Sequence, residues 1–239
     1  MLMPGLSPPQ AAAAATFARG VVARGVAHVV VGVDGPAMVA SPTIAGRQVM
    51  LLWSEHDQAA RWADVLVSEP RVEAIALADL LGLLLPDLEA RGVLIGPDWS
   101  DDPADPQVEA SALGITIADA AVDRFCAEAA LRGHVYVLTG PDGMAGAASA
   151  DATAAAVLPL WNDRAQALDF AAGPWDGYVP HRLTLADLGQ RTLLWCVENG
   201  WRVAPGFGSG LGELRAGDLK ARLRGAAAAA RSPHAPVAA

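Results

Sequence analysis

Residues 157–172 read VLPLWNDRAQALDFAA, and residues 49–64 read VMLLWSEHDQAARWAD. The two stretches carry a tryptophan at the same place, Trp161 and Trp53, and they share a Gln-Ala pair and a later aromatic residue. A short apolar run, followed by polar residues and then by apolar residues at helical spacing, is typical of a buried strand that leads into a helix. The same strand and helix therefore occur twice, and this duplication decides the fold that we expect.

The duplication extends to both sides at a constant offset of 108 residues, which pairs Phe17 with Phe125 and Pro97 with Pro205. A Leu-Ala-Asp-Leu segment at 77–80 returns at 185–188. No gap is needed over this span, so we expect each connection between elements to be short and packed, since loops otherwise tolerate insertions well. Two copies within 239 residues predict two domains of about 100 residues each.

Each copy is expected to contain a helix, a hairpin, a third strand, a second helix, a further strand, a third helix and a last strand. The hairpins are indicated by Asp-Gly at 34–35 and 142–143, between apolar runs. This order does not fit a Rossmann unit. The sequence therefore predicts an α+β protein made of two tandem homologous domains, each with a small, mainly antiparallel sheet and packed helices.

The boundaries follow from the same pattern. We place the first α+β repeat at residues 11–102, a linker at 103–118, the second repeat at 119–224, and a disordered, alanine-rich tail at 225–239. Ser54 and Asn162 follow the third strands and are expected to be the N-caps of the next helices. Pro86 lies inside the predicted helix 77–91 and is expected to break or kink it.

The composition argues against several classes of function. The formal net charge is −9 and the chain has a single lysine, Lys220, so binding to nucleic acid is not expected. No apolar run is long enough for a membrane span, and the N-terminus does not resemble a secretory signal, so we expect a cytoplasmic protein. Cys126 and Cys196 are expected to be buried thiols rather than a disulfide or a metal pair.

No set of residues indicates catalysis, a metal or a cofactor. Residues 54–57 read Ser-Glu-His-Asp, but consecutive residues at the start of one helix cannot converge as a triad. His28, His134, His181 and His234 lack metal-ligand spacing. The glycine-rich segment 206–212 lacks the spacing of a phosphate loop and is interpreted as a flexible connector. Asp98, Asp101 and Asp102 could bind calcium loosely but lack the EF-hand pattern.

Tryptophans are the remaining candidates. Trp53 and Trp161 are expected either to bury their rings in the core while the N–H reaches outward, or to stack on a ligand. Trp201 has Val93 as its counterpart, so it does not indicate a duplicated site. The candidate ligand-binding residues are Trp53, Trp161, Trp175 and Trp201.

The order of these parts resembles the bacterial domain-of-unknown-function 2750 family, present here as a tandem duplication. The resemblance rests on the Asp-Gly hairpin, the Leu-Pro-Leu-Trp strand end, the Leu-Ala-Asp-Leu helix and the Val-Leu-Ile-Gly-Pro strand. It is clearest over 157–205. The first copy departs from it at Leu51, where the second has Pro159, and at Pro86. The family implies no known reaction, so it supplies no catalytic residues.

Two functions remain open. One is a non-enzymatic protein-interaction module, an adaptor or immunity-like protein, in which the two repeats form an intrachain pseudo-dimer that docks a basic partner protein. The other is a small-molecule binding protein or enzyme, with its site in the groove between the repeats, because clefts between domains favour ligands.

Overall fold

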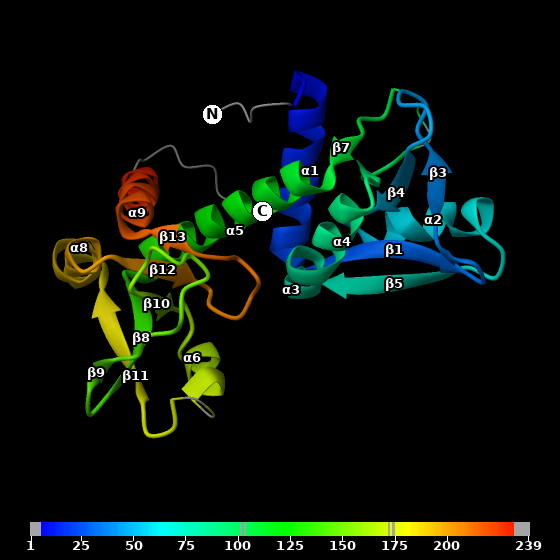
Figure 1. The fold of residues 1–239 in the computed structure, drawn as a ribbon. Coiled ribbons are helices and arrows are strands. Elements are labelled where there is room, and N and C mark those ends of the chain that lie inside the picture. Colours follow the sequence, from blue (N-terminus) through cyan, green and yellow to red (C-terminus); the bar gives the residue numbers. More distant parts are fainter. Residues whose placement is uncertain (1–5, 101, 103, 172, 174, 232–239) are drawn as a thin grey trace. The chain divides into compact units, whose positions relative to one another are not determined.

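The structure is a computed structural model that describes residues 6–100, 102, 104–171, 173 and 175–231. It divides into two compact units, Met1–Ala121 and Val122–Ala239, and each is described here by itself (Figure 1). Within the described residues, no helix is long and apolar enough to cross a membrane.

The first unit runs through helices and strands in the expected order. Its elements are α1 (Pro8–Arg24), β1 (Val26–Gly32), β2 (Gly35–Pro36), β3 (Met38–Ala40), β4 (Gln48–Leu52), α2 (His56–Leu66), β5 (Arg71–Ala76), α3 (Leu77–Asp79), the π-helical η1 (Leu80–Leu84), α4 (Leu85–Ala90), β6 (Leu94–Pro97) and β7 (Val108–Glu109). The Asp-Gly turn joins β1 to β2, where Gly35 takes a φ of 111°.

The second unit repeats this order after helix α5 (Ala110–Arg132). Its elements are β8 (His134–Gly140), β9 (Gly143–Met144), β10 (Ala156–Leu160), α6 (Arg164–Ala171), β11 (Val179–Thr184), α7 (Leu185–Asp187), the π-helical η2 (Leu188–Thr192), α8 (Leu193–Glu198), β12 (Trp201–Pro205), β13 (Leu214–Arg215) and α9 (Ala216–Arg231).

The strand pairing is also repeated. In the first unit, β1 lies between β2 and β5, and a second sheet has the order β3-β4-β6-β7. In the second unit, β8 lies between β9 and β11, and the other sheet has the order β10-β12-β13. Only β4–β6 and β10–β12 are parallel among the described pairs. The expectation of an α+β fold in two tandem copies, with mainly antiparallel pairing, is confirmed.

The predicted linker is wrong from Ala110 to its end, because α5 begins at Ala110 and not near 119. Ala110, Leu113 and Ile117 are fully buried at helical spacing, and they correspond to Ala216, Leu219 and Leu223 at the start of α9. Each repeat therefore ends with a helix of its own. In the middle of the chain this closing helix continues without a break into the opening helix of the second repeat, which hides the boundary in the sequence.

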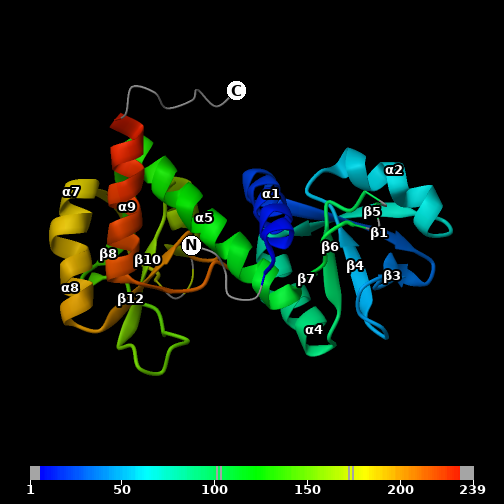
Figure 2. The same ribbon diagram turned by 90° about the horizontal axis from the view of Figure 1, so that it is seen from above.

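The tail is corrected in the same way. Helix α9 continues to Arg231, so residues 225–231, which were expected to be disordered, are helical. Alanine has the highest intrinsic helix propensity, and here it extends a helix whose first turns are anchored in the core. Figures 1 and 2 show α9 beside the second half of α5, where Arg222 bonds to Asp123 at 2.9 Å. Residues 232–239 lie outside the described residues.

The break expected at Pro86 takes the form of a π-helical segment. η1 ends at Leu84, and Pro86 lies in the first turn of α4, where a missing N–H is tolerated. The second unit has the same segment, η2, with Leu194 at the place of Pro86. The π-helical segment is therefore a property of the repeat, and proline is not its cause.

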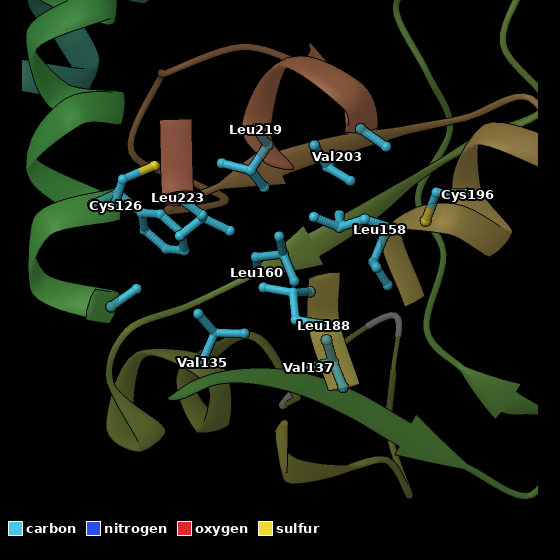
Figure 3. Packing of buried hydrophobic residues seen from close by; sticks show 14 of the residues in the cluster. Cys126, Val135, Val137, Leu158, Leu160, Leu188, Cys196, Val203, Leu219 and Leu223 are labelled. Carbon is cyan, nitrogen blue, oxygen red and sulfur yellow. The ribbon is translucent and has the colours of Figure 1, made fainter. Parts of the chain in front are cut away.

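The core of the second unit packs β8, β10 and β12 against α5, α8 and α9 (Figure 3). Leu158, Leu160 and Leu188 have no exposed surface. Cys126 and Cys196 lie in this core as free thiols, and burial raises their pKa values to about 12 and about 11. The prediction of buried thiols is confirmed.

Candidate functional site

Trp53 and Trp161 are core residues. Both rings are at least 99% buried, and both indole N–H groups donate to backbone carbonyls that correspond in the two repeats, Trp99 at 3.0 Å and Phe207 at 3.2 Å. Each ring packs in its core and its N–H is satisfied within the same repeat, which favours a packing role over ligand stacking. Their part in ligand binding stays a prediction.

Trp175 and Trp201 meet at Gly146 in the second repeat. The Nε1 of Trp175 donates to the Gly146 carbonyl at 3.3 Å, and a Cβ on Gly146 would come within 2.7 Å of the Trp201 ring. Trp175 also contacts Phe207, with ring centroids 5.7 Å apart. Trp161, Trp175 and Trp201 thus belong to one repeat, and Trp53 belongs to the other.

The sequence did not indicate that 206–212 is packed. Phe207 contacts Trp161 and Phe170, with centroids 6.1 and 5.6 Å apart. Gly208 has a φ of 91° and lies so close to Phe170 that a Cβ would overlap its ring. The interpretation of this segment as a flexible connector is therefore wrong at its start, because aromatic packing orders it.

The first repeat has an open groove beside its hairpin and the end of α2. One part, about 550 Å³, is lined by the hairpin at 33–38 and by residues 64–68. An adjoining part, about 380 Å³, has these lining residues: Val39, Ala40, Pro42, Val49, Val65, Leu66, Trp99, Asp102, Asp105 and Gln107. Both parts share Val65 and Leu66, so we treat them as one groove, called here the first-repeat groove.

The two repeats differ at several positions beside this groove, and α2 extends to Leu66 whereas α6 ends at Ala171, the counterpart of Ala63. The offset of 108 residues places Val67 opposite Trp175 and Met38 opposite Gly146. Trp175 connects the segment after α6 to the end of the hairpin, whereas Val67 is short and packs against Gly32. This contrast could have been read from the aligned copies, and it is the signal that the sequence interpretation missed.

The carbonyl of Met38 is directed away from β4. The Leu51 N–H donates to the Ala37 carbonyl at 3.4 Å, so the adjacent Met38–Met50 pair is of the kind that exchanges no hydrogen bonds. The Met38 carbonyl therefore points away from β4, as the Gly146 carbonyl does where it accepts the bond from Trp175. Met38 itself lines the groove.

The groove is acidic. Its lining includes the carboxylates of Asp34, Asp64, Asp102 and Asp105, and it includes no lysine, arginine or histidine. Asp105 accepts from the Ser100 N–H at 2.6 Å, and Asp102 accepts from the Ala104 N–H at 2.8 Å, which holds both carboxylates in place. The chain as a whole carries a net charge of −9, so these carboxylates add to an already negative protein.

Ser54 and Asp98 form a hydrogen-bonded pair in the first repeat, called here the polar corner, and Ser54 is not the N-cap of α2. Ser54 donates through its N–H to Asp98 Oδ1 at 2.7 Å and through its hydroxyl to Oδ2 at 3.2 Å, so Glu55 occupies the N-cap of α2. Burial raises the pKa of Asp98 despite these hydrogen bonds. The prediction of Ser54 as the cap is wrong, because a carboxylate at the end of the parallel neighbour β6 binds it.

The second expected cap is wrong for a similar reason. The amide nitrogen of Asn162 donates to the Phe125 carbonyl of α5 at 3.0 Å, and the Asp163 carboxylate accepts from the Ala165 N–H at 2.7 Å. Asp163 therefore caps α6, while Asn162 ties the strand end to α5.

The polar corner lacks the geometry of a nucleophilic site. The Ser54 hydroxyl bonds to a carboxylate and not to a histidine ring. His28 is 92% buried, and its Nδ1 has no partner among the described atoms; burial, followed by the charges of His56 and Arg24, lowers its pKa. Within the described part of the chain, no three His, Cys, Asp or Glu side chains are grouped to hold a metal. Asp101 lies outside that part.

The family described as Protein of unknown function (DUF2750) matches residues 14–116 and again residues 122–213. Curated proteins give no match to the chain. Among solved structures, a chain of Anabaena Tic22, described by the words protein transport, is 12% identical over 80% of this chain and 92% of its own, with a TM-score of 0.25. A likeness this weak carries no argument about function.

Proposed function

We propose that this chain, which belongs to the DUF2750 family through both of its repeats, is a non-enzymatic protein-interaction module of the adaptor or immunity-like kind. The observation that carries the proposal is the first-repeat groove. In the second repeat the Trp175 indole bonds to the Gly146 carbonyl and packs on Phe207, whereas the first repeat has Val67 at this sequence position and a groove with acidic and apolar walls. A basic partner protein that covers this groove would bury the apolar floor and approach the carboxylates at once.

The apolar and acidic lining residues of the first-repeat groove fit this function. Val39, Leu66 and Trp99 supply apolar surface, and the acidic residues surround it, which is the arrangement of an interface with an apolar centre and a polar rim. The proposed compartment is the cytoplasm, in keeping with two buried free thiols.

The test is partner capture by matched variants. Val67→Trp places a tryptophan in the wall of the groove, at the sequence position of Trp175, and we expect it to reduce capture of the bound protein from native lysate at least about tenfold. Leu131→Trp adds the same ring at a position that is 79% exposed and outside the groove, and should leave capture unchanged. Raising the salt should weaken capture, because exposed charges are screened. Equal capture by the wild type and Val67→Trp would count against the groove.

A small-molecule binding protein is the second candidate, and the groove volume favours it. About 550 Å³ lies within the usual range of ligand pockets, although the site would then lie inside the first repeat and not between the repeats. A thermal-shift screen with a metabolite library tests this candidate. A ligand that stabilises the wild type and not Val67→Trp would support it, and a screen without any shift would remove it.

A further inference from the structure

We propose that the first-repeat groove binds a tryptophan side chain on a basic segment of the partner protein. This inference rests on the proposed function and names the chemistry that the groove recognises. The second repeat supplies a template for the bound state, because there Trp175, at the sequence position of Val67, bonds to the carbonyl of Gly146, the residue that matches Met38.

The template has two contacts. The Trp175 indole donates its N–H to the Gly146 carbonyl at 3.3 Å, and its ring lies against Phe207 with centroids 5.7 Å apart and planes inclined by 65°. One contact is directional and needs an N–H donor on the ring. The other is an edge-to-face contact between aromatic rings, worth about 0.5–1.5 kcal/mol beyond the buried area.

The first repeat keeps both receptors and lacks the indole. Met38 takes the place of Gly146 with its carbonyl directed away from β4, and Trp99 takes the place of Phe207. Trp99 is held by Trp62, with ring centroids 5.1 Å apart, and it lines the groove. An indole that enters the groove would therefore have a carbonyl and an aromatic ring to contact, with Met38 in one part of the groove and Trp99 in the adjoining part.

The acidic residues of the groove determine which residues should flank the tryptophan of the partner segment. Asp34 and Asp64 lie at one end of the groove, and Asp102 and Asp105 lie at the other. Lysine or arginine residues on both sides of the tryptophan would reach these carboxylates, whereas an acidic segment would be repelled. A basic segment with a central tryptophan satisfies the carbonyl, the ring and both acidic ends together.

The experiment measures binding of a blocked pentapeptide, Arg-Lys-Trp-Lys-Arg, to the full chain by calorimetry, with amide chemical-shift mapping to locate it. We expect shifts at the groove residues. A peptide with 1-methyltryptophan should bind about fivefold more weakly, because one hydrogen bond is lost. Peptides with leucine at the centre, or with glutamate at the flanks, should bind at least about tenfold more weakly.

Variants of the chain provide the matched controls. Val67→Trp should abolish binding, and Leu131→Trp should not affect it. Because Val67 packs against Gly32, the double variant Asp34→Asn/Asp64→Asn is a second probe that leaves this packing intact. It should weaken binding several-fold and reduce its dependence on salt.

The outcomes separate this inference from the proposed function. Equal binding of the tryptophan and leucine peptides would overturn the indole assignment. So would the absence of peptide binding alongside a partner whose capture is lost in Val67→Trp, although the protein-interaction function would then stand. Tryptamine bound as tightly as the peptide would overturn the assignment to a partner segment and identify a small aromatic amine as the ligand.

Discussion

Replacing Asp98 with glycine tests what the polar corner contributes to the first repeat. Asp98 has a left-handed backbone with φ of 50°, and the matching residue in the second repeat is Gly206 with φ of 63°. Glycine relieves about 1 kcal/mol of backbone strain, but the unfolded chain gains about 0.5–1 kcal/mol of entropy, so the two effects nearly cancel. The side chain therefore decides the sign.

The loss of the carboxylate leaves two hydrogen-bond donors of Ser54, its N–H and its hydroxyl, without their acceptors. Ser54 is 6% exposed, so its N–H would remain buried without an acceptor, which costs about 1–3 kcal/mol, and its hydroxyl would lose a further bond of about 1 kcal/mol. Removal of a buried charge offsets part of this. We expect Asp98→Gly to lower the free energy of unfolding by about 2–3 kcal/mol at neutral pH, measured by urea denaturation with tryptophan fluorescence.

Two further variants separate hydrogen bonding from charge. Asp98→Asn keeps an acceptor for the Ser54 N–H and removes the charge, so it should be as stable as the wild type or more stable at neutral pH. Gly206→Asp places a carboxylate at the left-handed position of the second repeat, where Asn162 replaces serine, and should destabilise by about 1–2 kcal/mol.

The pH dependence follows from the raised pKa of Asp98, whose first cause is burial. Because the folded state binds this proton more tightly than the unfolded state, the proton stabilises the fold below the ordinary value of 3.8. That stability is lost as the pH rises through the raised pKa. The advantage of Asp98→Asn over the wild type should therefore shrink as the pH falls through the raised pKa toward 3.8, and stay constant at lower pH. Greater stability of Asp98→Gly than of the wild type at neutral pH would refute the reasoning.

The remaining predictions concern the second repeat. Gly208→Ala should destabilise it by about 2–4 kcal/mol in urea denaturation, because φ is 91° and the added Cβ overlaps Phe170; little effect would show that the turn is loose. Leu158→Ala should cost about 3–5 kcal/mol in the same assay, since the side chain is fully buried. Cys126 and Cys196, with pKa values raised to about 12 and 11, should resist thiol reagents at pH 7 until the chain unfolds. Rapid labelling of the folded chain, read by mass spectrometry, would contradict their burial.

The regular elements could be predicted because their cause is local. Apolar periodicity, the Asp-Gly turns and the glycines at helix ends each act within a few residues, and the repeat at 108 residues confirms them against each other. The predicted N-caps were wrong because Ser54 and Asn162 bond to partners 44 and 37 residues away in the sequence. A capping rule that considers only neighbouring residues cannot predict such partners.

The predicted boundary between the repeats was wrong for a different reason. Pro103 and Pro106 suggested a linker, but residues from Ala110 onward are helical because Leu113 and Ile117 are buried. Leu113 and Ile117 match Leu219 and Leu223 at an offset of 106 residues. An alignment of the two copies at the constant offset of 108 does not pair them. Burial extends a helix that composition alone would end.

By itself, the sequence determined that the chain is an α+β protein built twice, because hydrophobic periodicity and turn chemistry act over short distances and occur in both copies. Only the tertiary structure showed that the first copy has a groove and which contacts Trp175 makes in the second. Trp175 and Val67 are both ordinary apolar residues in a sequence, and what distinguishes them is the space around each. The Trp175 indole bonds to the Gly146 carbonyl, whereas Val67 packs against Gly32 and lines the groove between the hairpin and α2. The sequence does not show this difference, because a cavity is a property of packing between distant segments.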